Sequence, residues 1–259
     1  MVSPLRPNAS ALMRSLGTLL ISLTLVSCSV LEVKDETAGW NADDFLNEGQ
    51  KHMAASDWPS AITTYRKMLG RFPYGQNAEQ AQLDMAYAYL KNDELALAVS
   101  GADQFIQMHP THPNVDYAFY LKGLALFQPP EGWIDALSGV NPASNDIAPV
   151  QEAFLVYQEL INRFPESRYT ADAKKRLIYI INVLATHEVQ VASYYYGLGA
   201  DVAAINRARN VLETYQSSSA VEDALGIMMN AYARMGLADL RDDTARVLRL
   251  NFPDSRYLN

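Results

Sequence analysis

One stretch of this 259-residue chain occurs twice in nearly the same form, and it constrains the fold more than any other feature. Residues 61–73 read AITTYRKMLGRFP and residues 153–165 read AFLVYQELINRFP. Each copy has a tyrosine four residues after its first alanine and closes with Arg-Phe-Pro, and weaker closing triplets end at Pro110, Gln216 and Pro253. Self-similarity at a fixed spacing predicts a repeat architecture.

The closing triplets lie 37, 55, 51 and 37 residues apart, which indicates two basal units and two with extra residues. A period in the mid-thirties is typical of the tetratricopeptide repeat, a pair of antiparallel helices. In the first unit, Phe45, Gly49, Ala61 and Tyr65 stand at consensus positions. Gly49 and Ala61 let two helix backbones approach closely, and we expect Tyr65 to fill the space between this hairpin and the next. The sequence therefore predicts an all-α superhelix of about five hairpins.

The third unit carries an insertion. Gly123 lies 30 residues before Ala153, where the repeat needs only about 12, and the surplus falls in residues 128–149, which are rich in proline and glycine. The insertion has an apolar patch that could fold back on the repeats or be offered to a partner. The patch consists of Trp133, Ile134 and Leu137.

The fourth unit is long for a different reason. Residues 167–196 contain neither glycine nor proline, which predicts one unusually long helix. We therefore divide the repeats into an N-terminal part, residues 42–127, and a C-terminal part, residues 150–259, on either side of the insertion.

The first 27 residues have the pattern of a secretion signal. Arg6 and Arg14 precede an apolar run over residues 16–26, which is too short to span a bilayer. The run ends in Leu-Val-Ser before Cys28, the only cysteine of the chain, as in a lipobox. We expect cleavage before Cys28, a diacylglycerol on its thiol and an acyl chain on its new amine, with residues 28–41 as the lipidated tether. An ordinary cleavage site that contains a cysteine is the alternative. By similarity to lipoprotein sorting, Ser29 favours the outer membrane.

The composition argues against several classes of function. Without residues 1–27, which hold two arginines and no acids, the formal net charge changes from −8 to −10, which disfavours binding to nucleic acid or anionic lipid. The sequence has no Gly-x-Ser-x-Gly, phosphate-loop or dinucleotide motif. His109 and His112 are three apart, but Pro110 and Pro113 keep them off a regular helix, and no second pair completes a zinc site. We therefore predict no catalytic residues, no metal and no cofactor besides the lipid.

The inner face of the stacked hairpins is the predicted binding surface. In this fold the first helix of each hairpin lines a groove through four recurring positions, where tyrosines beside aliphatic residues would suit an extended peptide with aromatic side chains. Alternatively, some of these side chains pack only against neighbouring helices. The predicted peptide groove consists of Leu46, Met53, Leu83, Tyr87, Leu90, Tyr117 and Tyr120.

Four stretches resemble the BamD family, the tetratricopeptide lipoproteins of the outer-membrane β-barrel assembly machinery. They read RFPYGQNAEQAQLDMAYAYLKN, HPTHPNVDYAFYLKGLA, RFPESRYTADAKKRL and ASYYYGLGADVAAINRARNVLETY. The resemblance implies a non-catalytic scaffold at the periplasmic face of the outer membrane. It implies that the C-terminal repeats hold the last periplasmic domain of the barrel subunit BamA. It also implies that the N-terminal repeats meet the C-terminal signal of unfolded barrel proteins, and that a companion lipoprotein such as BamC lies along one side.

The resemblance also implies the residues that bind BamA. The family's arginine that supports BamA coupling matches Arg207, and we place Asn206 and Asp201 in the same contact. Asp201 stands where the family usually has an aromatic residue, and Leu198 where it often has a basic one. Within the insertion, residues 145–146 are Asn-Asp in place of an Arg-Asp pair. A tetratricopeptide lipoprotein that serves peptidoglycan enzymes or cell division is the alternative function.

Overall fold

A computed structural model describes residues 35–129 and 147–258 of the protein. The signal segment, Cys28 and the apolar patch of the insertion lie outside these residues, as does the Asn-Asp pair. The chain divides into two units, residues 1–41 and 42–259. Within the first unit, Asp35 accepts hydrogen bonds from the Thr37 amide at 3.0 Å and from its hydroxyl at 2.6 Å, which form a short turn.

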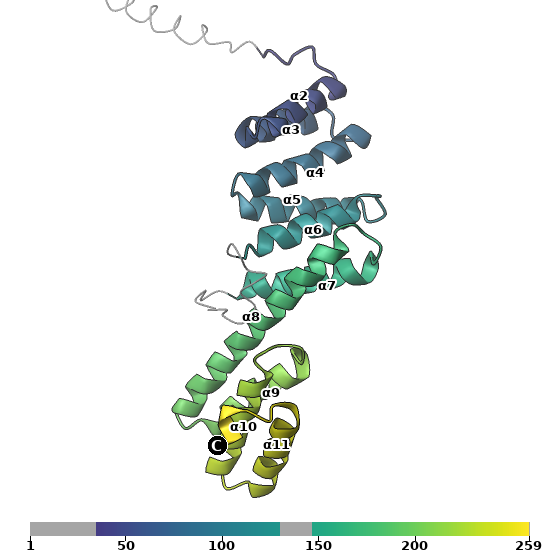
Figure 1. Ribbon diagram of the computed structural model, residues 1–259. Coiled ribbons are helices and arrows are strands. Elements are labelled where there is room, and N and C mark those ends of the chain that lie inside the picture. Colours follow the sequence, from purple (N-terminus) through teal and green to yellow (C-terminus); the bar gives the residue numbers. More distant parts are fainter. Residues whose placement is uncertain (1–34, 130–146, 259) are drawn as a thin grey trace, which may run out of the picture. The chain divides into compact units, whose positions relative to one another are not determined.

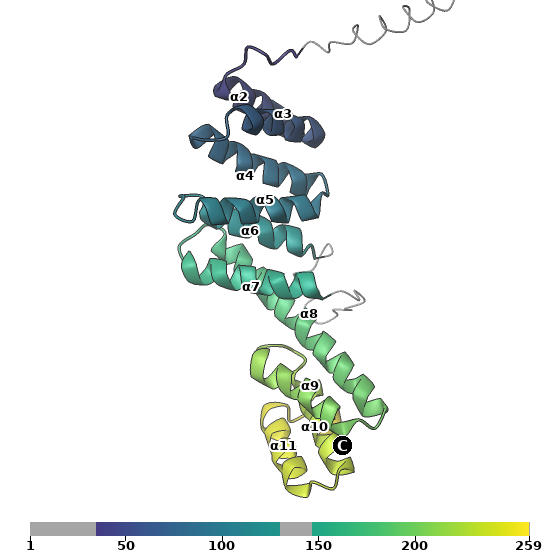
Figure 2. The same ribbon diagram turned by 180° about the vertical axis from the view of Figure 1, so that it is seen from behind.

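The second unit is all-helical in its described residues, and the predicted fold class is confirmed (Figures 1 and 2). Each helix packs against the next one along the chain, and α4 also contacts α2 and α6. None of the helices in residues 35–129 and 147–258 is both long and apolar enough to cross a membrane. The helices are α2 Ala42–Ala54, α3 Trp58–Arg71, α4 Gln76–Lys91, α5 Leu95–Met108, α6 Val115–Leu126, α7 Ala148–Arg163, α8 Thr170–Gly197, α9 Asp201–Thr214, α10 Val221–Arg234 and α11 Ala238–Asn251, followed by the short 3-10 helix η1 Arg256–Leu258.

The helix ends follow local sequence signals. At the start of α3, the Asp57 carboxylate accepts a hydrogen bond from the Ser60 amide at 3.3 Å, and Pro59 occupies the first turn. An acceptor at this position satisfies one of the amides that the first helical turn leaves unpaired. Helix α7 begins at Ala148, inside residues 128–149 that we predict as the insertion.

The repeated tyrosines occupy the centres of the hairpins. Tyr65 and Tyr157 are fully buried. The Tyr65 hydroxyl also donates a hydrogen bond to Asp84 of α4 at 3.2 Å, so this side chain connects the first hairpin to the second, as expected from the repeat pattern. Burial raises the pKa of the Tyr65 hydroxyl far above its usual value, and the nearby Asp84 carboxylate adds to the effect.

Helix α8 has 28 residues, more than any other helix in the described residues, and it contacts α7, α9 and α10. Halfway along it, the buried side chain of Asn182 accepts hydrogen bonds from the Ser219 amide at 2.9 Å and the Ser219 hydroxyl at 3.1 Å. Its own amide group donates to the Ile178 carbonyl at 2.9 Å. One large apolar cluster spans α6 to α10 around this helix. Helix α8 therefore belongs to the core of the third, fourth and fifth hairpins together.

Candidate functional sites

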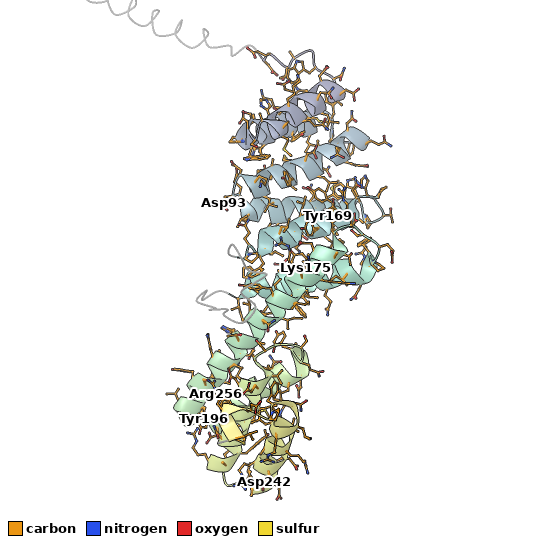
Figure 3. All side chains as sticks on the ribbon, in the orientation of Figure 1. Asp93, Tyr169, Lys175, Tyr196, Asp242 and Arg256 are labelled. Atoms are coloured by element: carbon orange, nitrogen blue, oxygen red, sulfur yellow. The ribbon has the colours of Figure 1, made fainter. Side chains whose placement is uncertain are left out.

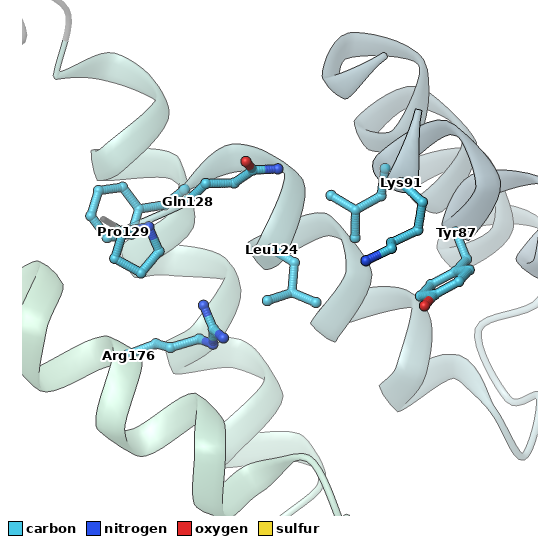
Figure 4. Close-up of a pocket in the computed structure, with 8 residues that line it drawn as sticks. Tyr87, Lys91, Leu124, Gln128, Pro129 and Arg176 are labelled. Atoms are coloured by element: carbon cyan, nitrogen blue, oxygen red, sulfur yellow. The ribbon is translucent and has the colours of Figure 1, made fainter. Parts of the chain in front are cut away.

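The predicted groove residues do not all lie on one open surface. Tyr87 and Leu90 of α4 line a cavity of about 400 Å³ between α4, α6 and α8 (Figure 4). The rings of Tyr87 and Trp58 of α3 form a T-shaped pair, with their centroids 5.9 Å apart. Leu46 and Met53 of α2 are half-buried and do not line this cavity. The rest of the cavity wall consists of Lys91, Leu124, Phe127, Gln128, Pro129 and Arg176.

Leu83 is a core residue and does not line a groove. Only 1% of its surface is exposed, because Phe105 of α5 and Ala118 of α6 pack over it. The recurring position in the repeat suggested an inward-facing side chain, but the next hairpin covers that side of α4. Our placement of Leu83 on the open face is therefore corrected.

Tyr117 and Tyr120 of α6 stack on a third tyrosine, Tyr169, which was not among the predicted groove residues. The ring of Tyr169 lies 5.2 Å from that of Tyr117 and 4.8 Å from that of Tyr120, both nearly parallel. Tyr169 lies directly before α8 (Figure 3). The RFPESRYTADA stretch shows a tyrosine four residues after the closing proline, but only the structure shows that its ring turns toward α6.

Tyr120 is further held by the first turn of α8. Its hydroxyl donates to the Asp172 carboxylate at 2.7 Å, and Arg176 donates to the same carboxylate at 2.6 Å. Burial, together with the Asp172 carboxylate, raises the pKa of Tyr120 to about 12. Burial tends to raise the pKa of Asp172, but the hydrogen bonds from Tyr120 and Arg176 outweigh it and leave that pKa below its usual value. Tyr117 and Tyr120 are therefore held by Tyr169 and by the first turn of α8, and the chain itself covers part of their surface.

Arg207 lies in a separate ion pair on the C-terminal hairpins. Its guanidinium approaches the two carboxylate oxygens of Glu188 on α8 at 3.3 and 3.4 Å. About half of the Arg207 side chain is exposed, whereas Glu188 is 6% exposed. Asn206 beside it is exposed. Glu188 holds the Arg207 guanidinium from inside the fold, and the exposed side of the guanidinium can pair with an acidic group of another protein.

Asp201 is held by a different cation. Arg234 of α10 donates through Nε to both Asp201 oxygens at 2.9 Å and through a second nitrogen to the Tyr196 carbonyl at 2.7 Å. The guanidinium also lies 3.9 Å from the centre of the Tyr196 ring. Leu198, between these residues, is exposed. The structure therefore gives Asp201 and Arg207 separate ion-pair partners.

Comparison with known proteins places the chain in a family. The family model YfiO, described as outer membrane lipoprotein, matches residues 40–248. The chain belongs to this family. BamD of Neisseria meningitidis serogroup A, an outer membrane protein assembly factor, is 37% identical over 93% of this chain and 92% of its own length. BamD of Vibrio cholerae is 32% identical over 91% of this chain and 96% of its own. A thermophilic TPR protein of Thermus thermophilus overlays with a TM-score of 0.37 and 13% identity, over 84% of this chain and 95% of its own.

As a BamD-family member the chain is associated with the outer membrane.

The histidines of its HPTHP stretch take part in packing. His109 and His112 approach the two oxygens of Glu79 at 3.6 and 3.5 Å, and both rings pack on Phe105. In the described parts of this BamD-family chain, no group of three or more histidine, cysteine or acidic side chains is arranged to hold a metal ion.

Proposed function

We propose that this chain is a non-catalytic scaffold lipoprotein that helps to assemble outer-membrane β-barrel proteins from the periplasmic face of the membrane. Its C-terminal hairpins bind BamA through the surface around Arg207. Its N-terminal hairpins bind the C-terminal signals of unfolded barrel proteins on the face that holds Tyr87 and Leu90, and a companion lipoprotein such as BamC joins the same complex. The observation that carries the proposal is the family relation over nearly the whole repeat region.

The Arg207 surface supports the first part. Glu188 is nearly buried, so it fixes the guanidinium from inside the fold and leaves its outer side for a partner. In a pull-down, Arg207→Glu is expected to reduce recovery of BamA about tenfold or more, because it places like charge against an acidic partner group. Arg209→Glu is the matched control, since Arg209 is an exposed arginine on the same helix.

Recovery of BamA with Arg207→Glu equal to that with Arg209→Glu would refute the predicted contact. Arg207→Glu places a second carboxylate beside Glu188, so melting curves of both variants are needed to separate a loss of stability from a loss of contact. If Arg207→Glu has the melting temperature of the wild type and still recovers less BamA in the pull-down, the result supports a direct contact. Co-purification with peptidoglycan hydrolases and without any β-barrel protein would favour the alternative function.

The peptide-binding part is best tested at Tyr87. This tyrosine is half-buried and lines the cavity, whereas Tyr120 is engaged by Tyr169 and Asp172. Tyr87→Ala is expected to weaken cross-linking of a barrel protein's C-terminal peptide several-fold, because the cavity loses an aromatic wall. Tyr194→Ala is the control, since that tyrosine is exposed on the last turns of α8. Undiminished cross-linking to the Tyr87→Ala protein would reject this use of the cavity.

The anchor is the third part of the proposal. Acyl groups on Cys28 would hold the chain at the membrane, because each buried methylene adds about 0.8 kcal/mol. Cells that express the wild type should incorporate labelled palmitate into the protein, and Cys28→Ala should abolish incorporation and move the protein out of the membrane fraction. Labelling that persists in Cys28→Ala would place the lipid elsewhere.

A further inference from the structure

One arginine joins three helices where α8 meets α9. Arg234, the last residue of α10, donates through Nε to both carboxylate oxygens of Asp201 at 2.9 Å and contacts the same carboxylate through Nη2. Its Nη2 also donates to the carbonyl of Tyr196, in the last turn of α8, at 2.7 Å (Figure 3). The fifth hairpin, formed by α10 and α11, therefore holds the turn of the fourth, formed by α8 and α9.

The charges around this arginine suit its position. The carbonyl groups at the end of a helix carry partial negative charge, so the end of α8 attracts a cation. Asp201 is the first residue of α9, where the opposite end of a helix dipole stabilises a carboxylate. Arg234 thus separates two negatively charged groups that would otherwise lie next to each other.

The bonds at the turn are shorter than those farther along α9. Charge-assisted hydrogen bonds between nitrogen and oxygen are usually about 2.7–2.9 Å long. The bonds that Arg234 donates at 2.7 and 2.9 Å have these lengths, and its guanidinium also lies 3.9 Å from the centre of the Tyr196 ring. Arg207 lies 3.3 and 3.4 Å from the oxygens of Glu188. The contacts of Arg234 therefore restrict the start of α9 more than the Glu188 pair restricts its middle.

A movement of the turn would reach Arg207. The turn includes Gly197 and Gly199, which tolerate a wide range of backbone angles. Residues 201–207 contain neither glycine nor proline at which the helix could kink, and they span only about 9 Å along its axis. A shift of the first turn of α9 would therefore carry Arg207 with it.

We propose that Arg234 is a positioning residue for the contact with BamA: it fixes the turn between α8 and α9 and so keeps Arg207 where BamA can pair with it. The inference rests on the proposed binding of BamA at the Arg207 surface. It gives the fifth hairpin a part in a contact that the fourth hairpin makes.

The test measures the kinetics with which the mature protein binds immobilised BamA, both in mild detergent. Arg234→Gln removes the charge and keeps a planar polar group. A loosened turn lowers the fraction of molecules that present Arg207 correctly, so the association rate should fall about three- to tenfold while the dissociation rate changes less than about twofold. Arg234→Lys keeps the charge without the planar fork and should give an intermediate association rate. It also provides a measurement if the glutamine variant does not fold.

A double variant separates positioning from direct contact. If Arg234 acts through Arg207, adding Arg234→Gln to Arg207→Ala should change the affinity for BamA less than about twofold, because the group that it positions is already gone. A merely structural loss would lower the affinity in both backgrounds.

Arg256→Gln is the matched control. Arg256 pairs with Asp223 of α10 at 2.7 Å and lies 5.0 Å from the centre of the Tyr257 ring, so this variant also loses a carboxylate and a tyrosine contact. Asp223 lies in the first turn of α10, whereas Arg234 is its last residue. Arg256→Gln should therefore keep the wild-type association rate.

The outcomes separate the inference from the proposed function. An unchanged association rate in Arg234→Gln would refute the inference and leave the binding of BamA standing. An equal loss of affinity with and without Arg207 would refute it too, because Arg234 would then act independently. A loss confined to the dissociation rate would mean that Arg234 itself contacts BamA and does not act by positioning. If the wild type does not bind BamA, the proposed function fails, and the inference fails with it.

Discussion

An ideal Cβ atom on Gly49 of α2 would lie 2.3 Å from Cε1 of Tyr65 of α3. The tyrosine ring therefore fills the space that the side chain of any other amino acid at position 49 would need. The same relationship recurs in the third hairpin, where a Cβ on Gly123 would lie 2.5 Å from Cζ of Tyr157. Both rings are fully buried and cannot swing away into solvent. The two repeated sequence stretches therefore form the same close contact.

Gly49→Ala is expected to lower the free energy of unfolding by about 1–3 kcal/mol, because overpacking outweighs the better helix propensity of alanine. Gly70→Ala is the matched control. Nothing lies within 4 Å of a Cβ there, so this change in α3 should be neutral or stabilise by up to about 1 kcal/mol. Urea unfolding measures both. A Gly49→Ala protein as stable as the Gly70→Ala protein would contradict the packing.

Asp84 should destabilise the protein when it is ionised. Burial raises its pKa, and the hydrogen bonds from Gln80 at 2.7 Å and Tyr65 at 3.2 Å only partly offset this. Asp84→Asn is therefore expected to raise stability at pH 7 by up to about 1 kcal/mol. The advantage should shrink as the pH falls through the raised pKa toward the ordinary value of 3.8, because the wild-type carboxyl then becomes neutral too. Thermal melts from pH 7 to pH 3 measure the difference.

Asp172 should behave in the opposite way. Its pKa is lowered in the folded state, so its ionised form stabilises the fold above the ordinary value of 3.8. Asp172→Asn should cost about 1 kcal/mol at pH 7, because the charge-assisted bond to Arg176 is lost. The wild type should lose this benefit as the pH falls below 3.8 and through the lowered pKa. A pH-independent difference between Asp172→Asn and the wild type would show that charge is not the cause.

Asn182 should stabilise the protein through its hydrogen bond from the Ser219 amide. Replacing it with leucine leaves the Ser219 amide without its acceptor, which is expected to cost about 1–3 kcal/mol. Ser219→Ala is the control, because it removes only the hydroxyl bond and keeps the backbone bond; its cost should stay below about 1 kcal/mol. Hydrogen exchange at the Ser219 amide gives a second readout and should accelerate in Asn182→Leu alone.

Arg207 and Glu188 should be energetically coupled. Arg207→Ala leaves the nearly buried carboxylate of Glu188 without its cation and is expected to cost about 1 kcal/mol. Adding Glu188→Gln should restore part of that loss, because the unpaired charge is then gone. A double-mutant cycle measures the coupling, and a value of zero would mean that the pair contributes nothing to the fold.

The hairpin architecture could be predicted because its signals are local. The tyrosines in the repeated stretches mark the hairpin centres, and the stretch without glycine or proline marks α8, which runs from Thr170 to Gly197. Asp57 and Pro59 mark the start of α3 in the same way. Each of these features depends on residues within a turn or two of each other along the chain.

The side-chain partners across hairpins could not be predicted, because they depend on how one repeat covers the next. Leu83 and Tyr87 are one helical turn apart on α4, yet Leu83 is sealed by Phe105 and Tyr87 faces the cavity. A single sequence also gives no sign that Tyr169 stacks on α6. The position of a residue within its repeat therefore predicts its helix face but not whether the neighbouring hairpin leaves that face open.

The length of α8 has a consequence for the two proposed surfaces. Arg176, on the cavity wall, and Glu188, behind Arg207, are both side chains of this one helix, 12 residues apart. At about 1.5 Å per residue, continuous hydrogen-bonded backbone holds them roughly 18 Å apart along its axis. A substrate peptide at the cavity and BamA at the Arg207 surface would therefore bind to the same helix. The length of that helix would fix the distance between them.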